Sequence, residues 1–129
     1  MRSLLTQPYA LVFLGGGMGS LLRFWAGRTV PATVAGASFP VAILLVNVVA
    51  SALLGLVAGW ATVRFVGEEE RLLIGVGFCG GLSTFSSFSY DTVILLQHGR
   101  PGAALLNVAA NVLLCGLASA VGLWITVKP

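Results

Sequence analysis

Charged residues are scarce in this sequence: only 9% of its 129 residues are charged, whereas 57% are hydrophobic. Soluble domains carry about 25% charged residues, so this composition excludes an ordinary soluble domain. The mean hydropathy of +0.99 predicts an integral membrane protein. Its apolar runs are continuous rather than alternating, which favours membrane-spanning helices over a β-barrel.

Cysteine and histidine are also rare, with two Cys and one His. Cys79 and Cys115 both fall within apolar runs, where a thiol behaves as a small hydrophobic group, so we expect no disulfide. No nucleophile and base pair, metal-ligand cluster or phosphate-binding loop is recognisable, which argues against an enzyme. The seven basic residues are scattered singly, which argues against binding to nucleic acid.

Four apolar segments reach the length of about 20 residues that is needed to cross a bilayer. They are residues 8–27, 39–63, 71–97 and 102–126. The short connections contain Pro and Gly, which read as turns, and leave no room for a soluble domain. No signal-peptide cleavage site follows the first segment, so we expect it to remain as a span. The sequence thus predicts a single four-helix membrane domain over residues 1–129.

The third segment is longer than a bilayer requires. A straight helix over it would be about 40 Å long, against about 30 Å of hydrocarbon. We predict a break in the helix at Gly75, Gly77, Gly80 and Gly81, which precede a hydroxyl-rich run at positions 83–89. Broken backbone at membrane depth is tolerated only where it is buried in protein or lines a wet cavity.

Basic residues near the ends of the spans give almost no orientation signal under the positive-inside rule. One side of a four-span protein would carry Arg2, Arg64, Arg71 and Lys128, and the other side Arg23, Arg28 and Arg100. Insertion in both orientations with antiparallel self-association explains this balance. Chance in a small sample explains it equally well.

Amide side chains interrupt two of the spans. Asn47 lies in an otherwise apolar run, and an amide in hydrocarbon needs hydrogen-bond partners. Asn107, Asn111, Cys115 and Ser119 recur every four residues and so form one stripe on a helix. Packing contacts between helices and the lining of a pore both remain open for these residues.

Two charged residues lie near the ends of spans. Arg23 either extends its side chain to the membrane interface or forms a positive vestibule that attracts anions. Asp91 either caps or pairs with a neighbour, or marks proton coupling. The other spans supply no second carboxylate or His for a proton relay.

Phe85 and Phe88 are three residues apart and share a helical face with Asp91, among Ser and Thr side chains. Aromatic rings have a positive edge and hydroxyls are hydrogen-bond donors, so together they offer an anion favourable contacts without a full charge. A small, strongly hydrated anion would suit such a lining. Conduction needs entry and exit both to remain easy, which a full positive charge in a narrow pore would prevent.

Three stretches carry a resemblance to a known family: "GGGMGSLLRFWAG", the Asn in "LLVNVVAS", and "GFCGGLSTFSSFSYD". They resemble the Fluc (also called CrcB) fluoride channels. The resemblance implies a dual-topology homodimer of two antiparallel four-helix subunits, with two fluoride pores and a Na⁺ ion at the dimer centre. It also implies passive, fluoride-selective export across the bacterial cytoplasmic (inner) membrane, which lowers the internal concentration.

The resemblance also implies roles for individual residues. Phe85 and Phe88 would be the pore-facing aromatic pair, and Asn47 the pore amide. The backbone carbonyls of Gly80 and Ser83 would hold the Na⁺. The fluoride pathway is expected to include Phe85, Phe88, Asn47, Thr84, Ser86, Asn111, Asp91 and Arg23, with Thr84 and Ser86 in the hydroxyl-bearing motif, Arg23 in the vestibule and Asp91 where relatives carry Glu.

This sequence departs from the family pattern on two helices. Ala42 and Ile43 stand where relatives often carry Gly and Thr, so a hydroxyl expected along the pore wall is missing. Asn107, Asn111 and Cys115 stand where relatives commonly show Tyr or Ser and two further Ser positions. Cys is a weak donor, so we expect a rearranged polar track.

Two rival functions come from other classes. A small dual-topology drug/proton antiporter would need a membrane-embedded carboxylate, usually in the first helix, and residues 8–27 contain none. A non-transporting membrane subunit would need only packing contacts, such as those of the glycine pairs Gly15/Gly19 and Gly55/Gly59. It leaves the cluster of hydroxyls and Phe rings unexplained.

Overall fold

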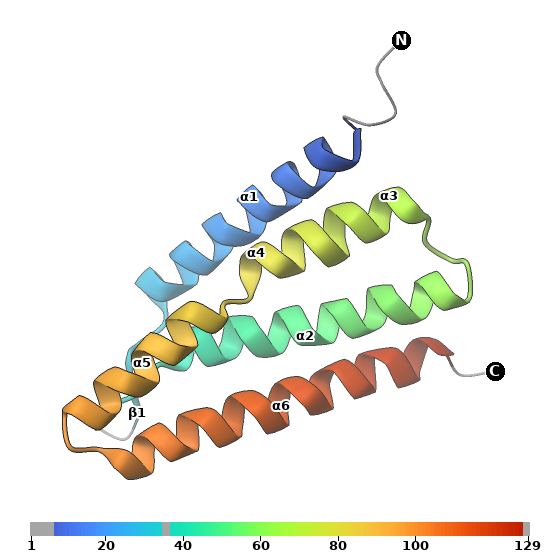
Figure 1. Cartoon of the computed structure of the whole chain (residues 1–129). Coiled ribbons are helices and arrows are strands. Elements are labelled where there is room, and N and C mark those ends of the chain that lie inside the picture. The colour runs from blue at the N-terminus through green and yellow to red at the C-terminus, as the bar shows by residue number, and fades with distance from the viewer. Residues whose placement is uncertain (1–6, 35–36, 128–129) are drawn as a thin grey trace.

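The computed structural model describes residues 7–34 and 37–127. Four long helical segments follow one another, with a small hairpin between the first two (Figure 1). The elements are α1 (Gln7–Thr29), β1 (Thr33–Val34), β2 (Ala37–Ser38), α2 (Val41–Thr62), α3 (Glu68–Glu70), the π-helix η1 (Arg71–Cys79), α4 (Gly80–Leu82), α5 (Phe85–Gln97) and α6 (Pro101–Val127).

The prediction of four membrane-spanning helices is confirmed. Four helical segments of the described chain are long and apolar enough to cross a bilayer, and they are Gln7–Thr29, Val41–Thr62, Glu68–Gln97 and Pro101–Val127. The third begins earlier than the predicted residue 71, because Glu70 accepts a hydrogen bond from the Gly67 backbone N–H at 2.9 Å. Such a capping interaction, with acidic side chains in the first turn, stabilises a helix start. The acidic residues Glu68–Glu70 are therefore helical.

The two ends of the molecule are marked by contacts between loops. At one end the side chain of Gln7 donates to Glu69 at 3.0 Å, joining the start of α1 to the start of the third segment. At the other end Arg100 donates to the Ser38 carbonyl, joining the α5–α6 turn to the hairpin. These contacts fit helices that alternate in direction. Arg2 and Lys128, which entered the charge comparison, lie outside the described residues.

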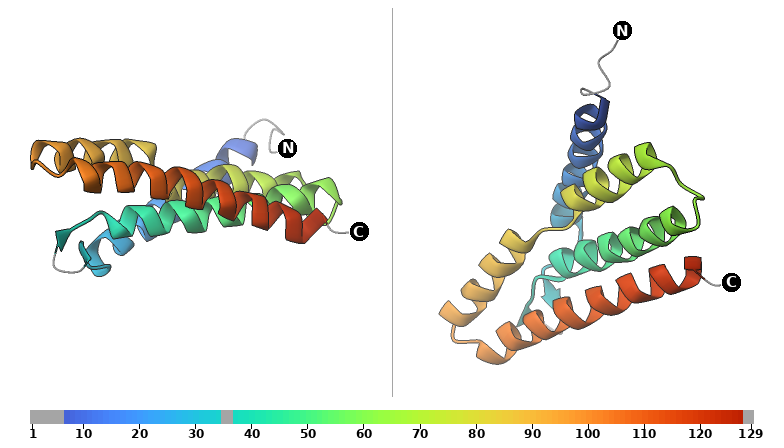
Figure 2. Two further views of the ribbon diagram at one scale, coloured as in Figure 1. Left: turned by 90° about the horizontal axis from the view of Figure 1, so that it is seen from below. Right: turned by 45° about the vertical axis from the view of Figure 1, so that its right-hand side comes forward.

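The helices approach closely where glycine leaves room. α6 lies beside α2, and α1 lies against η1 and α4, in both views of Figure 2. A Cβ at Gly15 or Gly19 would collide with backbone atoms of η1 or α4, and one at Gly55 would collide with the Ser119 backbone of α6. Both glycine pairs predicted from the sequence therefore serve packing within one subunit.

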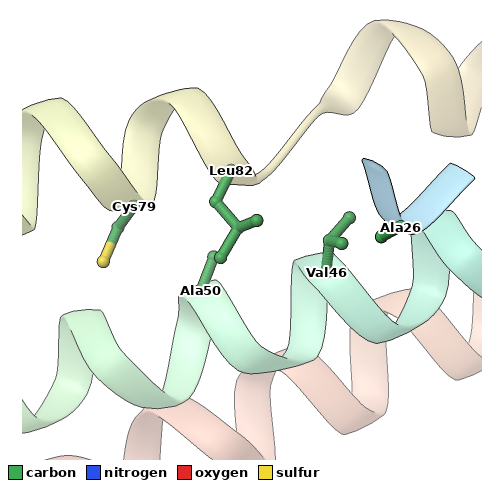
Figure 3. Packing of buried hydrophobic residues seen from close by; sticks show 5 residues of the cluster. All are labelled: Ala26, Val46, Ala50, Cys79 and Leu82. Atoms are coloured by element: carbon green, nitrogen blue, oxygen red, sulfur yellow. The ribbon is translucent and has the colours of Figure 1, made fainter. Parts of the chain in front are cut away.

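The buried apolar core is small. It consists of Ala26, Val46, Ala50, Cys79 and Leu82, with Cys79 and Leu82 directed toward α2 (Figure 3). Many large apolar side chains are exposed on the single chain. Large exposed apolar surfaces are rare on soluble monomeric proteins, so these side chains indicate contact with lipid or with another apolar partner. Cys79 and Cys115 are both free thiols, as expected.

Two residues of the third segment leave helical geometry. Ser83 (φ −75°, ψ 154°) and Thr84 (φ −152°, ψ 116°) are extended and separate α4 from α5, which is visible as the straight link between these helices in Figure 1. The preceding glycines remain helical. Gly77 and Gly81 instead lie against the backbone of α1 at Gly15 and Gly16, so their role is close packing.

Candidate functional site

Asn47 of α2 lies opposite the extended residues. Its Oδ1 accepts from the Thr84 backbone N–H at 2.8 Å, and its Nδ2 donates to the Thr84 carbonyl at 3.4 Å. Asn47 is 9% exposed and Thr84 is 8% exposed. A buried backbone group without a partner would be costly, so this single amide is what lets the helix open here.

Two carbonyl oxygens lose their helical donors at the extended residues. In a continuous helix the Thr84 N–H would donate to Gly80 and the Ser87 N–H to Ser83. Thr84 instead donates to Asn47, and the Ser87 N–H donates to Thr84 Oγ1 at 3.2 Å. The carbonyl oxygens of Gly80 and Ser83 therefore lose their usual helical donors.

Gly80 and Ser83 also share a small pocket of about 120 Å³, which is lined by Ala50, Ser51, Leu54, Gly75, Cys79, Gly80 and Ser83. A Cβ at Gly80 would meet no atom within 4 Å, so the space beside it is open. No cluster of three His, Cys, Asp or Glu side chains exists among the described residues. A cation bound here would depend on backbone and hydroxyl oxygens, as in other sites formed by unwound membrane helices.

Thr84 is the N-cap of α5. Its Oγ1 accepts from the Ser87 N–H and lies 3.2 Å from both Ser86 Oγ and Ser87 Oγ. Thr is a favoured N-cap residue because its hydroxyl satisfies a helix-terminal N–H. Thr84, within the hydroxyl-rich run, therefore has a local role: it caps the helix that begins after the extended residues.

A pocket of about 260 Å³, which we call the phenylalanine pocket, opens beside this helix start. It is lined by Asn47, Ser51, Ser83, Thr84, Phe85, Phe88, Asn111, Val112 and Cys115. Five of the predicted pathway residues thus meet on one wall: Asn47, Thr84, Phe85, Phe88 and Asn111. Sequence reasoning missed Ser51, although its position one helical turn after Asn47 was a usable signal.

The two phenylalanine rings are neighbours on α5, with centroids 5.4 Å apart and planes tilted by 53°. This is a favourable aromatic geometry. Phe88 is partly buried, whereas Phe85 is 79% exposed on the single chain. The pocket is therefore open on the side where Phe85 projects.

The polar stripe of α6 faces protein over much of its length. Asn107 is 0% exposed and Asn111 is 6% exposed. Ser119 donates to the Ser51 carbonyl at 3.1 Å. Of these residues Asn111 and Cys115 line the phenylalanine pocket, while Asn107 and Ser119 do not.

Arg23 and Asp91 do not line the phenylalanine pocket. Arg23 Nε donates to the Gly81 carbonyl at 3.0 Å, and the Arg23 side chain lines a pocket of about 460 Å³ with Arg28 and Ser87. Asp91 lines another pocket, of about 270 Å³, whose wall includes Ala42 and Ile43. Ser86 contacts Thr84 Oγ1 but lines none of these walls.

Comparison with known proteins reveals close relatives. The sequence model of a family described as "CrcB-like protein, Camphor Resistance (CrcB)" matches residues 10–123. The "Fluoride-specific ion channel FluC" of Pyrococcus furiosus is 50% identical over 110 residues, which cover 83% of this chain and 85% of the relative. The protein of the same name from Novosphingobium aromaticivorans is 48% identical over 105 residues (80% and 82%), and that of Klebsiella pneumoniae is 41% identical over 120 residues (92% and 93%).

Proposed function

We propose that this chain, which belongs to the CrcB-like family, is a passive fluoride-specific ion channel of the cytoplasmic (inner) membrane. The observation that carries the proposal is the wall on which Phe85, Phe88, Asn47 and Thr84 meet beside an interrupted helix. Export of fluoride down its gradient lowers the internal concentration without coupled energy. The chain performs no chemistry on the ion.

Hydrogen-bond donors and ring edges are the contacts that this wall offers an anion. Fluoride is small and strongly hydrated, so it must exchange water for protein donors as it passes. The Asn47 amide supplies N–H groups, and the rings of Phe85 and Phe88 supply positive edges. None of these groups carries a full charge, so the ion is held weakly enough to leave. Chloride is larger and less strongly hydrated, and a narrow, rigid lining would reject it.

The third span crosses the membrane as a broken helix. Extended backbone at Ser83 and Thr84 falls near the middle of the segment Glu68–Gln97, and its polar groups are satisfied by Asn47. This agrees with the rule that irregular backbone occurs in membranes only where protein or a wet cavity receives it. The break places the start of α5, with both Phe rings, at membrane depth.

The working unit is an antiparallel homodimer in which the subunits insert in opposite orientations. The nearly equal numbers of basic residues on the two sides support this arrangement. The exposure of Phe85, at 79%, supports it as well, because a pore wall needs a second surface to face it. A partner subunit and membrane lipid would together cover the exposed apolar side chains.

A structural Na⁺ at the dimer centre fits the released carbonyl oxygens of Gly80 and Ser83. Oxygen ligands suit a hard cation, and unwound backbone carbonyls serve this purpose in other membrane proteins. The ion would supply positive charge that holds the two interrupted helices together. Within this chain, Asn47 Oδ1 and Thr84 Oγ1 keep those oxygens available, because they accept from the Thr84 and Ser87 N–H groups respectively.

Arg23, Ser86 and Asp91 contribute away from the phenylalanine pocket. Arg23 and Arg28 give the 460 Å³ pocket a positive field that attracts anions to an entrance of the pathway. Ser86 supports Thr84 at the start of α5. Asp91 follows Phe88 by three residues on α5 and lines the 270 Å³ pocket, which shares Gly27 and Ile43 with the 460 Å³ pocket.

Anion efflux from liposomes tests the function. Purified dimer is reconstituted with internal KF and KCl, and release is driven by valinomycin while a fluoride electrode and a chloride electrode record both ions. Rapid fluoride release with chloride retained is the expected result. Retention of both ions by protein that is shown to be dimeric would overturn the channel proposal and favour a cation antiporter or a non-transporting subunit.

A further inference from the structure

All three asparagines of the sequence, Asn47, Asn107 and Asn111, belong to one hydrogen-bonded network. Asn47 comes from α2 and the other two from α6, and the side chain of Thr92 on α5 completes the set. We refer to these four side chains as the asparagine network. The three amides are between 0% and 9% exposed, and Thr92 is partly buried.

The first half of the network starts at the interrupted helix. The Thr84 N–H donates to Asn47 Oδ1 at 2.8 Å, and Asn47 Nδ2 donates to Asn111 Oδ1 at 2.9 Å. Asn111 Nδ2 in turn donates to the Oδ1 of Asn107 at 3.1 Å and to its backbone carbonyl at 2.9 Å. Each amide thus accepts on one side and donates on the other.

The second half returns to α5. Asn107 Nδ2 donates to Thr92 Oγ1 at 2.9 Å, and Thr92 Oγ1 donates to the Phe88 carbonyl at 2.8 Å. A backbone N–H can only donate and a backbone carbonyl can only accept. The two ends, at Thr84 and Phe88, therefore determine which way every amide between them is turned.

We propose that Asn107 and Thr92 are positioning residues of the ion pathway, which hold the Asn47 amide with its N–H groups rather than its oxygen available to a transported anion. Neither residue lines the phenylalanine pocket, so both act through Asn111 and Asn47. The role toward an anion rests on the proposed function, whereas the hydrogen bonds of the network and their direction do not.

The network resists reversal from both ends. An Asn47 amide turned by 180° would leave the Thr84 N–H without its acceptor and would bring its oxygen against Asn111 Oδ1. Relief would require Asn111 and then Asn107 to turn as well, and Thr92 would have to give up the Phe88 carbonyl. Inside a protein the effective dielectric constant is low, so hydrogen bonds are stronger and unpaired polar groups cost more than in water. One orientation of the network therefore dominates.

One donor of Asn47 stays available to an anion within this arrangement. Its Nδ2 contact with the Thr84 carbonyl is 3.4 Å, the longest contact that Asn47 makes here, whereas its contact with Asn111 is 2.9 Å. An anion in the pocket can therefore accept from the first N–H while the second remains bound to Asn111.

Nuclear magnetic resonance tests the network directly, since labelling with ¹⁵N-asparagine marks only three side-chain NH₂ groups. Variants that lack one asparagine each assign the three signals. In the dimeric wild-type protein we expect all three NH₂ groups to exchange slowly with D₂O. Exchange at the rate of free asparagine would overturn the inference without any variant.

Thr92→Val removes the far end of the network while preserving the shape of the side chain. We expect it to shift the Asn47 NH₂ signal and to slow fluoride efflux by about threefold to tenfold, the factor for losing one hydrogen bond. Chloride should remain inside, and Thr92→Ser should restore the wild-type signal and rate. Thr29→Val is the matched control, because Thr29 makes the same bond to the carbonyl four residues earlier but contacts no amide.

The possible outcomes separate the two proposals. An Asn47 signal unmoved by Thr92→Val, or a shifted signal with unchanged efflux, would overturn the positioning role. Wild-type liposomes that release no fluoride would overturn the proposed function, and the NMR spectra would still decide whether Thr92 orients Asn47.

Discussion

The side-chain amide of Asn47 and the backbone of Thr84 form a paired contact, with Thr84 N donating to Asn47 Oδ1 at 2.8 Å and Asn47 Nδ2 donating to Thr84 O at 3.4 Å. One amide on α2 thereby stands in for a peptide group of the missing helical turn. It accounts for three features together: the extended residues, the released Gly80 carbonyl oxygen, and the placement of Phe85 and Phe88 beside a polar wall.

Replacing Asn47 by Ala should destabilise the protein. Both Thr84 backbone groups would lose their partner in a buried setting, which costs about 1–3 kcal/mol of unfolding free energy. Thermal unfolding in detergent at fixed protein concentration measures the change. Ser51→Ala, one helical turn away on the same pocket wall, is the control and should leave the midpoint nearly unchanged. Equal shifts for the two variants would contradict the structural role of Asn47.

Replacing Phe85 or Phe88 by Ile should abolish or greatly slow fluoride efflux while the dimer remains intact. Ile keeps the apolar character but lacks the positive ring edge that an anion contacts. Phe13→Ile on α1 is a matched control, since Phe13 and Phe85 are both 79% exposed on the single chain. Efflux from liposomes and the elution volume on a sizing column are measured together. Normal rates in both pocket variants would eliminate the aromatic pathway.

The number and approximate bounds of the spans were predictable because the bilayer fixes how many apolar residues a helix needs. The location of the extended residues was predictable only to within a few positions. Glycine spacing indicated the region from Gly75 to Gly81, but those glycines are used for contact with α1, and the helix opens at Ser83 where Asn47 supplies a partner. That partner comes from another span, so no local pattern reveals it.

The site was predictable by residue type and less so by arrangement. A polar stripe on α6 could be recognised from its four-residue period, but the period does not tell which members meet α2 and α5. Asn107 also donates to Thr92 on α5, and no pattern in the sequence pairs these two residues. Arg23 and Asp91 were expected in the pathway with the Phe pair, but in space they line other pockets.

Replacing Gly19 by Ala should weaken the contact between α1 and the third span. A Cβ there would collide with the Phe78 carbonyl and approach the Leu82 N, which are backbone atoms that cannot turn aside. Overpacking of this kind costs about 1–3 kcal/mol. At Gly17 a Cβ meets nothing within 4 Å, so Gly17→Ala should be neutral or slightly stabilising. Unfolding midpoints of the two variants decide the matter, and a loss confined to Gly17→Ala would show that α1 packs differently.

Antiparallel assembly predicts that one gene product inserts both ways. A tag at the C-terminus should therefore be found on both faces of the membrane in similar amounts. Cysteine-free protein with a single reporter cysteine at the tag, labelled by an impermeant reagent before and after lysis, measures the two populations. Adding three Lys to the C-terminal tag should shift the ratio, because basic residues favour the cytoplasmic side. A single orientation of the unmodified chain would count against the antiparallel homodimer.

Arg23 and Arg28 line the same pocket but differ in what else they do. Arg23 donates to the Gly81 carbonyl at 3.0 Å, two residues before the extended backbone, whereas Arg28 stacks over the Phe24 ring at 5.8 Å. Arg23→Gln should slow fluoride efflux at every ionic strength, by about tenfold or more, because a hydrogen bond from a charged donor is lost beside the break. Arg28→Gln should slow efflux only at low ionic strength, since its long-range attraction of anions is screened within about 10 Å at 0.1 M salt.

Efflux rates at 10 mM and 300 mM potassium gluconate, chosen to lie on either side of that screening range, separate the two effects. If both variants recover fully at high salt, Arg23 acts through its charge alone and its contact with Gly81 does not support the pathway.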